Sequence, residues 1–247
     1  MDEKQKRSRF AELAEQSRRR HSFQYTDFLA PADAADALYA ASEKERRVFG
    51  GAENCERVMV RYGDPADTGY EEPFPIAVLR IRPQNPKFAE QLGHRDYLGA
   101  LMHLGLEREV FGDVLVRESG AYVFAEEHLA EYVCRELTQV RHTQVTCEWL
   151  EEVPEDACPR LLEETVTAAS ARLDAVIARV FHLSRTRAGG LFPAGHVQVG
   201  GRICEKESYT PDPGEIISVR GYGKFRFEGE EGTTKKGSLV LRIGRYQ

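Results

Sequence analysis

Apolar positions near the N-terminus recur mainly at helical spacing. Residues 3–21 place a few apolar side chains on one side of an otherwise charged segment, and a second helical pattern begins near Pro31. Residues 57–62 then alternate apolar and polar side chains, as a strand does. We therefore predict that residues 1–72 form a helical segment with one strand.

The middle of the chain changes repeatedly between the periods of strand and helix. The expected order is strand, helix, a hairpin of two strands, helix and strand, at residues 76–81, 94–104, 113–124, 126–137 and 143–150. This β-α-β-β-α-β order is typical of a ferredoxin-like sandwich, which RNA-recognition motifs also adopt, and we expect it over residues 73–153. The aromatic signature by which those motifs stack RNA bases is missing, so the order predicts the fold alone.

Two aromatic residues and one acidic segment of the middle region have simpler expected roles. We expect Tyr122 and Trp149 to lie in the core. Residues 151–159 are acidic and contain two prolines, which is typical of a linker.

An apolar stripe and a capping residue dominate the start of the last third. Four residues recur at helical spacing and predict a first helix: Leu173, Val176, Ile177 and Val180. Ser184 suits the N-cap of a second helix, which would place Arg185 and Arg187 in its first turn.

Strand patterns follow these two helices. Residues 195–202 predict a tight hairpin that turns at Gly200 and Gly201, and residues 216–219 predict a further strand. We therefore expect a C-terminal domain over residues 166–247 and an α+β fold for the chain.

Charge is distributed unevenly along the chain, although its formal net value is only −6. From Ala171 onward there are 13 Lys or Arg against 8 Asp or Glu, whereas residues 22–170 hold 14 against 28. The first 21 residues hold 7 against 4. Basic ends around an acidic middle favour a polyanionic partner that is bound by the ends.

The cations of the last third are the candidate RNA-binding residues. Arginines in the first turn of a helix face its positive dipole end, and a bound phosphate would relieve that conflict. The candidates are Arg172, Ser184, Arg185, Arg187, Arg202, Lys206, Arg220 and Lys224. A possible second RNA patch in the middle region consists of His94, Arg95 and Arg108. Any single one of these arginines could equally be a solvated surface residue, so the prediction rests on the whole set.

Motifs of catalysis, cofactor binding and membrane insertion are not found. The chain has no Gly-x-Gly-x-x-Gly after a strand, no Walker loop, no His-Glu-x-x-His and no Gly-x-Ser-x-Gly. Its five cysteines form no Cys-x-x-Cys pair. No apolar run is long enough to span a membrane, and the N-terminus lacks a secretory signal. We expect no catalytic residue, cofactor or metal, and a cytoplasmic protein that is a monomer.

Several motifs carry a specific resemblance. Arg-Leu-Asp at 172–174, Ser-Arg-x-x-Ala at 184–188, Gly-x-Val-x-Val at 195–199 and Gly-Glu-Ile-Ile-Ser-Val-Arg-Gly at 214–221 resemble the alpha-L, or S-four, RNA-binding domain. Residues 220–225 and 233–237, with 94–101 and 111–116, resemble the YlmH family of bacterial S-four proteins. The chain departs from the S-four pattern at Gly189, Gly190 and Pro193, so we predict that its second helix ends early.

The resemblance implies a non-enzymatic RNA-binding protein with an RNA-recognition-motif-like module. It implies contacts with large-subunit rRNA and tRNA on the 50S subunit, in ribosome-associated quality control. Two alternatives remain open: an RNA-modifying enzyme targeted by its S-four domain, and a cell-division adaptor whose acidic middle is the working surface. Arg172-Leu173-Asp174 also resembles a pseudouridine synthase motif, but the helical pattern that follows favours a cap or an ion pair for Asp174.

Overall fold

The charged N-terminal segment is one long helix that buries its few apolar residues. The computed structural model describes residues 3–246, and in it this helix is α1 (Glu3–Arg20), with Phe10 and Ala14 buried. The other elements here are β1 (Gln24–Tyr25), α2 (Pro31–Leu38), β2 (Arg46–Phe49), β3 (Met59–Tyr62) and α3 (Pro65–Thr68). We call residues 3–68 the N-terminal module.

The N-terminal module has more strands than the alternation predicts. Its sheet has the order β1-β3-β2, and only the central strand β3 is buried along its whole length. Strand β1 has two residues and β2 is mostly exposed, so neither has an alternating pattern that a sequence could reveal. The expectation of a single strand is therefore wrong, whereas α1 and α2 are confirmed.

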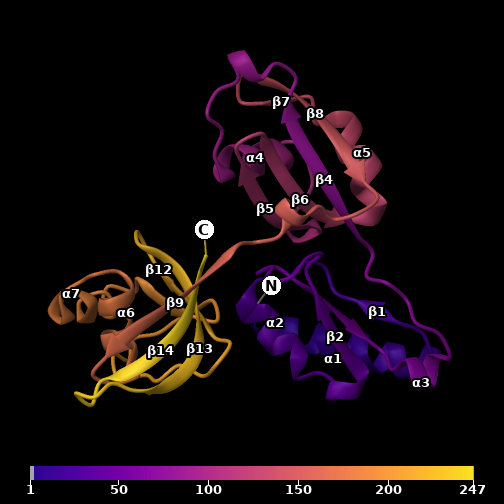
Figure 1. Cartoon of the computed structure of the whole chain (residues 1–247). Helices are drawn as coiled ribbons and strands as arrows, with labels where there is room; N and C mark the ends of the chain where they lie inside the picture. Colours follow the sequence, from indigo (N-terminus) through magenta and orange to yellow (C-terminus); the bar gives the residue numbers. More distant parts are fainter. Residues whose placement is uncertain (1–2, 247) are drawn as a thin grey trace. The chain divides into compact units, whose positions relative to one another are not determined.

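The middle of the chain folds as the expected sandwich. Its elements are β4 (Ile76–Pro83), α4 (His94–Met102), β5 (Phe111–Arg117), β6 (Gly120–Glu126), α5 (Ala130–Glu136), β7 (Gln139–Val140) and β8 (Thr143–Leu150). The sheet has the order β5-β6-β4-β8-β7, which is the ferredoxin-like order with one short edge strand added (Figure 1). Leu79, Ile81 and Val123 pack with Leu101 of α4 and Val133 of α5 in one core. We call residues 76–150 the sandwich domain.

The second face of this sheet is covered by other parts of the same unit. Phe28 and Met59 of the N-terminal module pack with Tyr122 and Phe124 of β6, and Ala157 closes the cluster from the chain that follows β8. Phe28, Phe124 and Ala157 are each 0% exposed. A sheet face that is free in RNA-recognition motifs is thus largely a core in this protein.

Two expectations for this region need correction. Residues 151–159 are not a free linker, because Arg117 donates to the carbonyl oxygens of Asp156 (2.7 Å) and Cys158 (2.9 Å). Trp149 is 43% exposed and not in the core. The physical reason is that β7 pairs with only the first two residues of β8, so the sheet edge beside Trp149 has no neighbouring strand.

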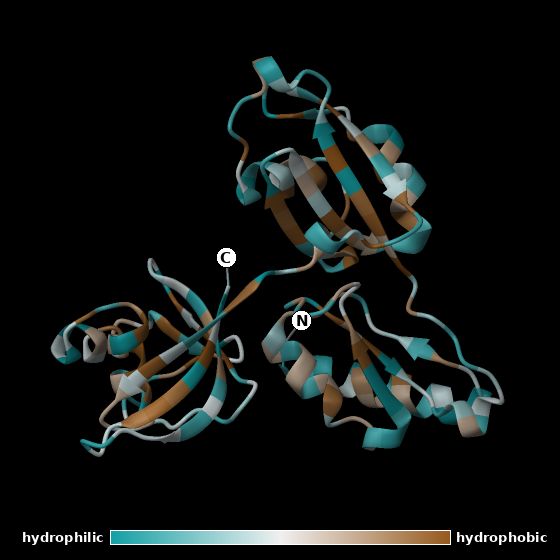
Figure 2. Cartoon of the chain, viewed as in Figure 1, coloured by the Kyte–Doolittle hydropathy of each residue, from teal (hydrophilic) through white to brown (hydrophobic). Residues whose placement is uncertain are grey.

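The remaining residues form a second compact unit, and the chain divides between Pro159 and Arg160. Its elements are β9 (Leu161–Ala168), α6 (Leu173–Val180), α7 (Arg185–Gly189), β10 (Val197–Val199), β11 (Arg202–Ile203), β12 (Ile216–Val219), β13 (Gly223–Thr233) and β14 (Leu239–Tyr246). We call residues 160–246 the C-terminal unit. Figure 2 shows apolar segments in the central strands of both large sheets.

Helix α6 is the centre of the C-terminal unit. It packs Leu173, Val176 and Ile177 against a six-stranded sheet of order β11-β10-β12-β13-β14-β9. Strand β9 lies at the edge of this sheet, paired antiparallel with β14, so the sheet begins before the expected start at residue 166. Strands β9, β13 and β14 were not predicted, whereas α6, α7, the hairpin and β12 were.

Two local predictions in the C-terminal unit are confirmed. Helix α7 ends at Gly189, as the glycines and proline there indicated. The β10–β11 hairpin turns through Gly200 (φ +54°) and Gly201 (φ +79°), a backbone that suits a tight primed turn.

Among residues 3–246, no helix is long and apolar enough to cross a membrane.

Candidate nucleic-acid interface

The N-termini of α6 and α7 position the central arginines of the C-terminal unit. At α6, the backbone N–H groups of Leu173 and Asp174 donate to the carbonyl oxygens of Tyr209 (2.7 Å) and Glu207 (3.2 Å). At α7, the Ser184 hydroxyl accepts from the N–H of Arg187 (3.2 Å), so the predicted N-cap is confirmed. At both helix starts, part of the free backbone N–H groups is therefore paired within the protein.

One buried carboxylate joins two of the predicted arginines. Arg172 donates from Nε to Oδ1 of Asp174 (3.1 Å), and Arg185 donates from Nη2 to Oδ2 (2.7 Å). The side chain of Asp174 is 7% exposed, whereas those of Arg172 and Arg185 are 44% and 55% exposed. The expected ion pair of Asp174 with neighbouring arginines is thus observed.

The titration of Asp174 reflects these contacts. Burial alone would raise the pKa of this carboxyl, but the hydrogen bonds from Arg185 and Arg172 outweigh burial and lower the pKa below its ordinary value. Asp174 is therefore ionised at neutral pH and neutralises part of the charge of both arginines. The dipole conflict of Arg185, which suggested a bound phosphate, is relieved by a carboxylate of the protein itself.

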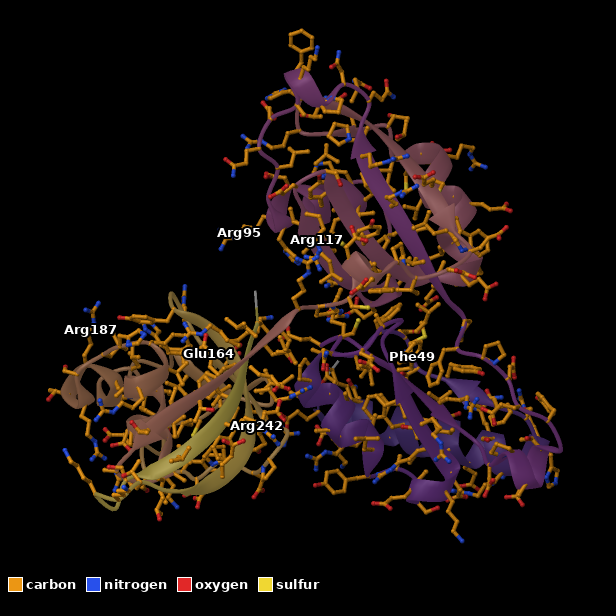
Figure 3. All side chains as sticks on the ribbon, viewed as in Figure 1. Phe49, Arg95, Arg117, Glu164, Arg187 and Arg242 are labelled. Carbon is orange, nitrogen blue, oxygen red and sulfur yellow. The ribbon has the colours of Figure 1, made fainter. Side chains whose placement is uncertain are left out.

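Three further predicted cations lie around the start of β13. Arg187 is exposed, points outward from α7 in Figure 3, and has Cζ 5.7 Å from the ring centroid of Tyr222. Arg220 is exposed at the end of β12, two residues before Tyr222. Lys224 has Nζ 5.3 Å from the ring centroid of Tyr246. Tyr222, which the sequence analysis did not select, therefore links the arginine of α7 to the turn that carries Arg220.

The last two predicted cations occupy different places. Lys206 is exposed in the loop whose Glu207 and Tyr209 carbonyls cap α6. Arg202 is exposed on the two-residue edge strand β11. The structure thus joins Arg172 and Arg185 through Asp174 and places Arg187 against Tyr222. Arg202 lies apart from them at the edge of the sheet, where β10 separates β11 from β12.

The proposed second patch is only partly assembled. His94 and Arg95 are exposed in the first turn of α4, and Arg95 points away from the domain (Figure 3). Arg108 does not join them, because its guanidinium donates to the carbonyl oxygens of Phe111 and Gly112. Burial, with the nearby Arg57 charge, lowers the pKa of Arg108 to about 10.

A different arginine, Arg141, lies near Arg95, and it forms an ion pair with Asp96 at 3.7 Å. Arg141 and Arg95 line one groove of about 480 Å³ between α4 and the β7–β8 turn. Arg141 has φ +53° and a side chain that is 55% exposed. The sequence offered one signal for it, an arginine next to a histidine between the predicted helix at 126–137 and the predicted strand at 143–150.

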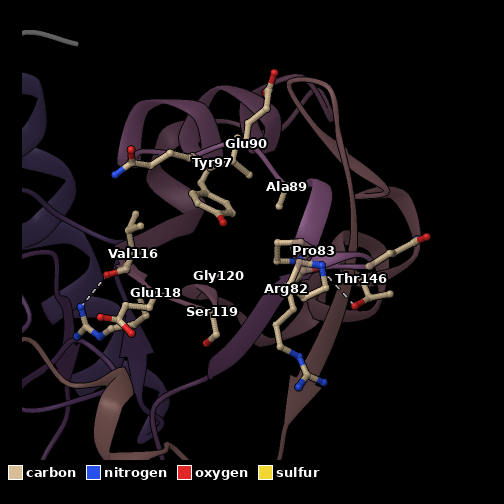
Figure 4. Close-up of a pocket in the computed structure, with 15 residues that line it drawn as sticks. Arg82, Pro83, Ala89, Glu90, Tyr97, Val116, Glu118, Ser119, Gly120 and Thr146 are labelled. Atoms are coloured by element: carbon tan, nitrogen blue, oxygen red, sulfur yellow. Dashed lines mark hydrogen bonds between the residues drawn. The ribbon is translucent and has the colours of Figure 1, made fainter.

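The sandwich domain also has a hollow. It measures about 1010 Å³ and lies between the β5–β6 turn and the chain before α4 (Figure 4). No His, Cys or Asp lines it. Its charged and hydroxyl-bearing lining residues are Arg82, Glu90, Tyr97, Arg117, Glu118, Ser119 and Thr146.

The cysteines do not form a reactive or metal-binding group. All five are free, and no cluster of ligands that could hold a metal is found in residues 3–246. Burial raises the pKa of Cys55 to about 12 and also raises that of Cys147, whose Sγ lies 3.5 Å from Sγ of Cys134. These thiols are not activated as nucleophiles.

Comparison with known families agrees with this geometry. Residues 70–153 match the model described as "Putative RNA-binding domain in YlmH", and residues 171–217 match the S4 domain. The chain is 30% identical over 226 residues to the ribosome-associated protein quality control protein P2 of Bacillus subtilis, covering 90% of this chain and 87% of that protein. It is also 40% identical over 77 residues to the small ribosomal subunit protein uS4 of Kosmotoga olearia, covering 29% of this chain and 37% of that protein.

Among solved structures, the cell division protein ylmH from Streptococcus pneumoniae matches with a TM-score of 0.45 and 20% identity, over 58% of this chain and 87% of that one. The α+β fold and the basic S4 domain define an RNA-binding protein of the S4 class. The chain belongs to the YlmH family, and it carries the RNA-binding domain of YlmH followed by an S4 domain.

Proposed function

We propose that the protein binds the 50S ribosomal subunit and tRNA in the cytoplasm and acts, without catalysis, in ribosome-associated quality control. The family and the name of the Bacillus subtilis relative support the ribosomal setting. The S4 domain supports RNA as the partner.

One observation carries the proposal. Exposed arginines of the C-terminal unit are held in two places. Arg172 and Arg185 share the carboxylate of Asp174, and Arg187 lies over the ring of Tyr222, two residues after the exposed Arg220. Residues 160–247 hold 14 Lys or Arg against 10 Asp or Glu, whereas residues 1–159 hold 20 against 30. Phosphate contacts by Arg and Lys supply most of the sequence-independent affinity for RNA.

The covered sheet of the sandwich domain supports a leading role for the C-terminal unit. A sheet face that packs against Phe28, Met59 and Ala157 is not free to stack bases. The groove of Arg95 and Arg141 also holds Asp96 and Glu136, so a phosphate contact there would be weaker than one in the C-terminal unit. An RNA-modifying enzyme is less well supported, because both matching family models describe RNA-binding domains.

Charge reversal at Arg185 and Arg220 tests the proposal. The R185E/R220E double variant should no longer co-sediment with purified 50S subunits, while circular dichroism should show a folded protein. The K235E/K236E variant is the matched control, because it changes the net charge equally at the turn between β13 and β14, the far end of β13 from Tyr222.

The outcomes are distinct. Retained co-sedimentation of R185E/R220E would show that this face does not bind the ribosome. Equal loss in both variants would mean that total charge, and not this face, determines association. Crosslinking of the native protein in cells should recover large-subunit rRNA and tRNA.

A further inference from the structure

Asp174 is a charged residue that is buried, and burial of a charge is unfavourable unless other groups compensate it. It lies in the first turn of α6, between the core residues Leu173 and Ala175, and its side chain is 7% exposed. The dipole of α6 favours a negative charge there, but burial of a carboxylate is unfavourable unless cations or hydrogen-bond donors surround it. Both of its oxygens accept hydrogen bonds from guanidinium groups.

The two arginines come from different elements and meet only at this carboxylate. Arg172 precedes α6 and presents Nε and Nη2 to Asp174, at 3.1 and 3.4 Å. Arg185 begins α7 and presents Nη2 alone, at 2.7 Å. The Nη1 groups of both arginines are not used in these bonds, and both side chains are about half exposed.

This arrangement lowers the loss of side-chain conformational entropy that accompanies phosphate binding. A solvated arginine must lose the freedom of several side-chain torsions when it binds, whereas these two are already held in one orientation. Guanidinium groups bind phosphate oxygens through paired N–H donors whose direction is fixed by the planar group. Two guanidinium groups held by one carboxylate therefore offer a prepared site for one phosphodiester.

We infer that Asp174 is a positioning residue that makes Arg172 and Arg185 a single phosphate-binding site for RNA. This inference rests on the proposed function and adds to it the one acidic residue on which the site depends. Asp174 itself need not touch RNA.

Charge and position make opposite predictions for Asp174. If only net charge mattered, replacement of an acidic residue near the interface by a neutral one would strengthen binding to a polyanion. If Asp174 orients the arginines, the same replacement weakens binding although the protein becomes more positive. The sign of the change therefore separates the two explanations.

The experiment compares D174N with D212N in the full chain, by titration with purified 50S subunits at several salt concentrations. Asn has the shape of Asp, and Asp212 is an exposed acid of the same unit, so D212N is the matched control for charge. We expect D174N to weaken binding about fivefold or more and D212N to leave it equal or slightly tighter. In D174N, and not in D212N, the slope of log affinity against log salt concentration should become shallower. The change should correspond to the loss of about one to two phosphate contacts.

A double-mutant cycle between Asp174 and the two arginines tests whether Asp174 acts through them. D174N should have no further effect in an R172A/R185A background, because the groups it positions are then missing. R185K, which keeps the charge but loses the planar group, should also weaken binding and does not disturb the core, since this side chain is 55% exposed.

Failure of the inference differs from failure of the proposed function. If R172A/R185A weakens binding and D174N does not, Asp174 does not position them. If neither variant changes binding while R185E/R220E abolishes it, the pair is not a phosphate site, yet the ribosomal function stands. If R185E/R220E also binds normally, the interface itself is wrong.

Discussion

The hydroxyl of Tyr122 donates to the carboxylate of Asp156, at 3.0 Å from each oxygen. Tyr122 lies on β6, on the sheet face that RNA-recognition motifs use, and Asp156 belongs to the segment that follows the sandwich domain. Burial, together with this hydrogen bond, raises the pKa of Tyr122. Tyr122 stands where an RNA-recognition motif could stack a base, but here it contacts another segment of the same chain.

The Tyr122→Phe variant tests whether this sheet face is structural. Removal of the hydroxyl should lower the free energy of unfolding by about 1.5–3 kcal/mol, the usual value for a hydrogen bond to a charged group. Affinity for 50S subunits should not change, because the ring stays packed with Phe124. Urea denaturation measures the first effect and co-sedimentation the second. Weaker ribosome binding without loss of stability would show that the face does meet RNA.

Gly112 tests the packing between the N-terminal module and the sheet. A Cβ atom at this position would lie 2.7 Å from the ring of Phe28 and 2.9 Å from Cβ of Phe124. Gly112→Ala should therefore destabilise the protein by about 1–3 kcal/mol through overpacking.

Gly99 offers the matched control for that substitution. It lies within α4, and a Cβ atom there would meet nothing within 4 Å. Gly99→Ala should stabilise the protein by up to about 1 kcal/mol, as expected inside a helix. If both glycine variants shift the urea midpoint in the same direction, the close approach of Phe28 to the sheet is not rigid.

Because of the ion pairs of Asp174, we expect the free energy of unfolding to depend on pH in the acidic range. Its pKa is lower in the folded protein than the ordinary 3.8, so the folded state binds this proton less tightly than the unfolded state. The contribution of Asp174 is complete above the ordinary pKa and is lost as pH falls through the lowered value.

The difference in unfolding free energy between the native protein and D174N should therefore be constant near neutral pH and shrink below about pH 4. Urea denaturation of both proteins between acidic and neutral pH measures it. A difference that grows as pH falls would contradict a lowered pKa.

Local signals in the sequence were enough to predict many of the helices and strands. The stripe of Leu173, Val176 and Ile177 predicted α6, Ser184 predicted the start of α7, and Gly200 with Gly201 predicted the hairpin. The order of patterns between residues 76 and 150 also predicted the ferredoxin-like sheet. Each of these depends on residues close together in the chain, which is why one sequence contains the information.

Other features depend on residues that are distant in the chain. The exposure of Trp149 follows from the short length of its edge neighbour β7, and the inward turn of Arg108 follows from carbonyls that only the folded loop presents. The covering of the sheet by Phe28 and Ala157 joins segments from both ends of the unit.

By itself, the sequence determined most of the helices, the β5–β6 and β10–β11 hairpins, the basic C-terminal third and the family resemblance, because capping, periodicity and charge are local properties. Only the tertiary structure decided that Arg172 and Arg185 share the buried carboxylate of Asp174. Burial and ion pairing depend on which elements pack together, and that packing brings the start of α7 back to the start of α6.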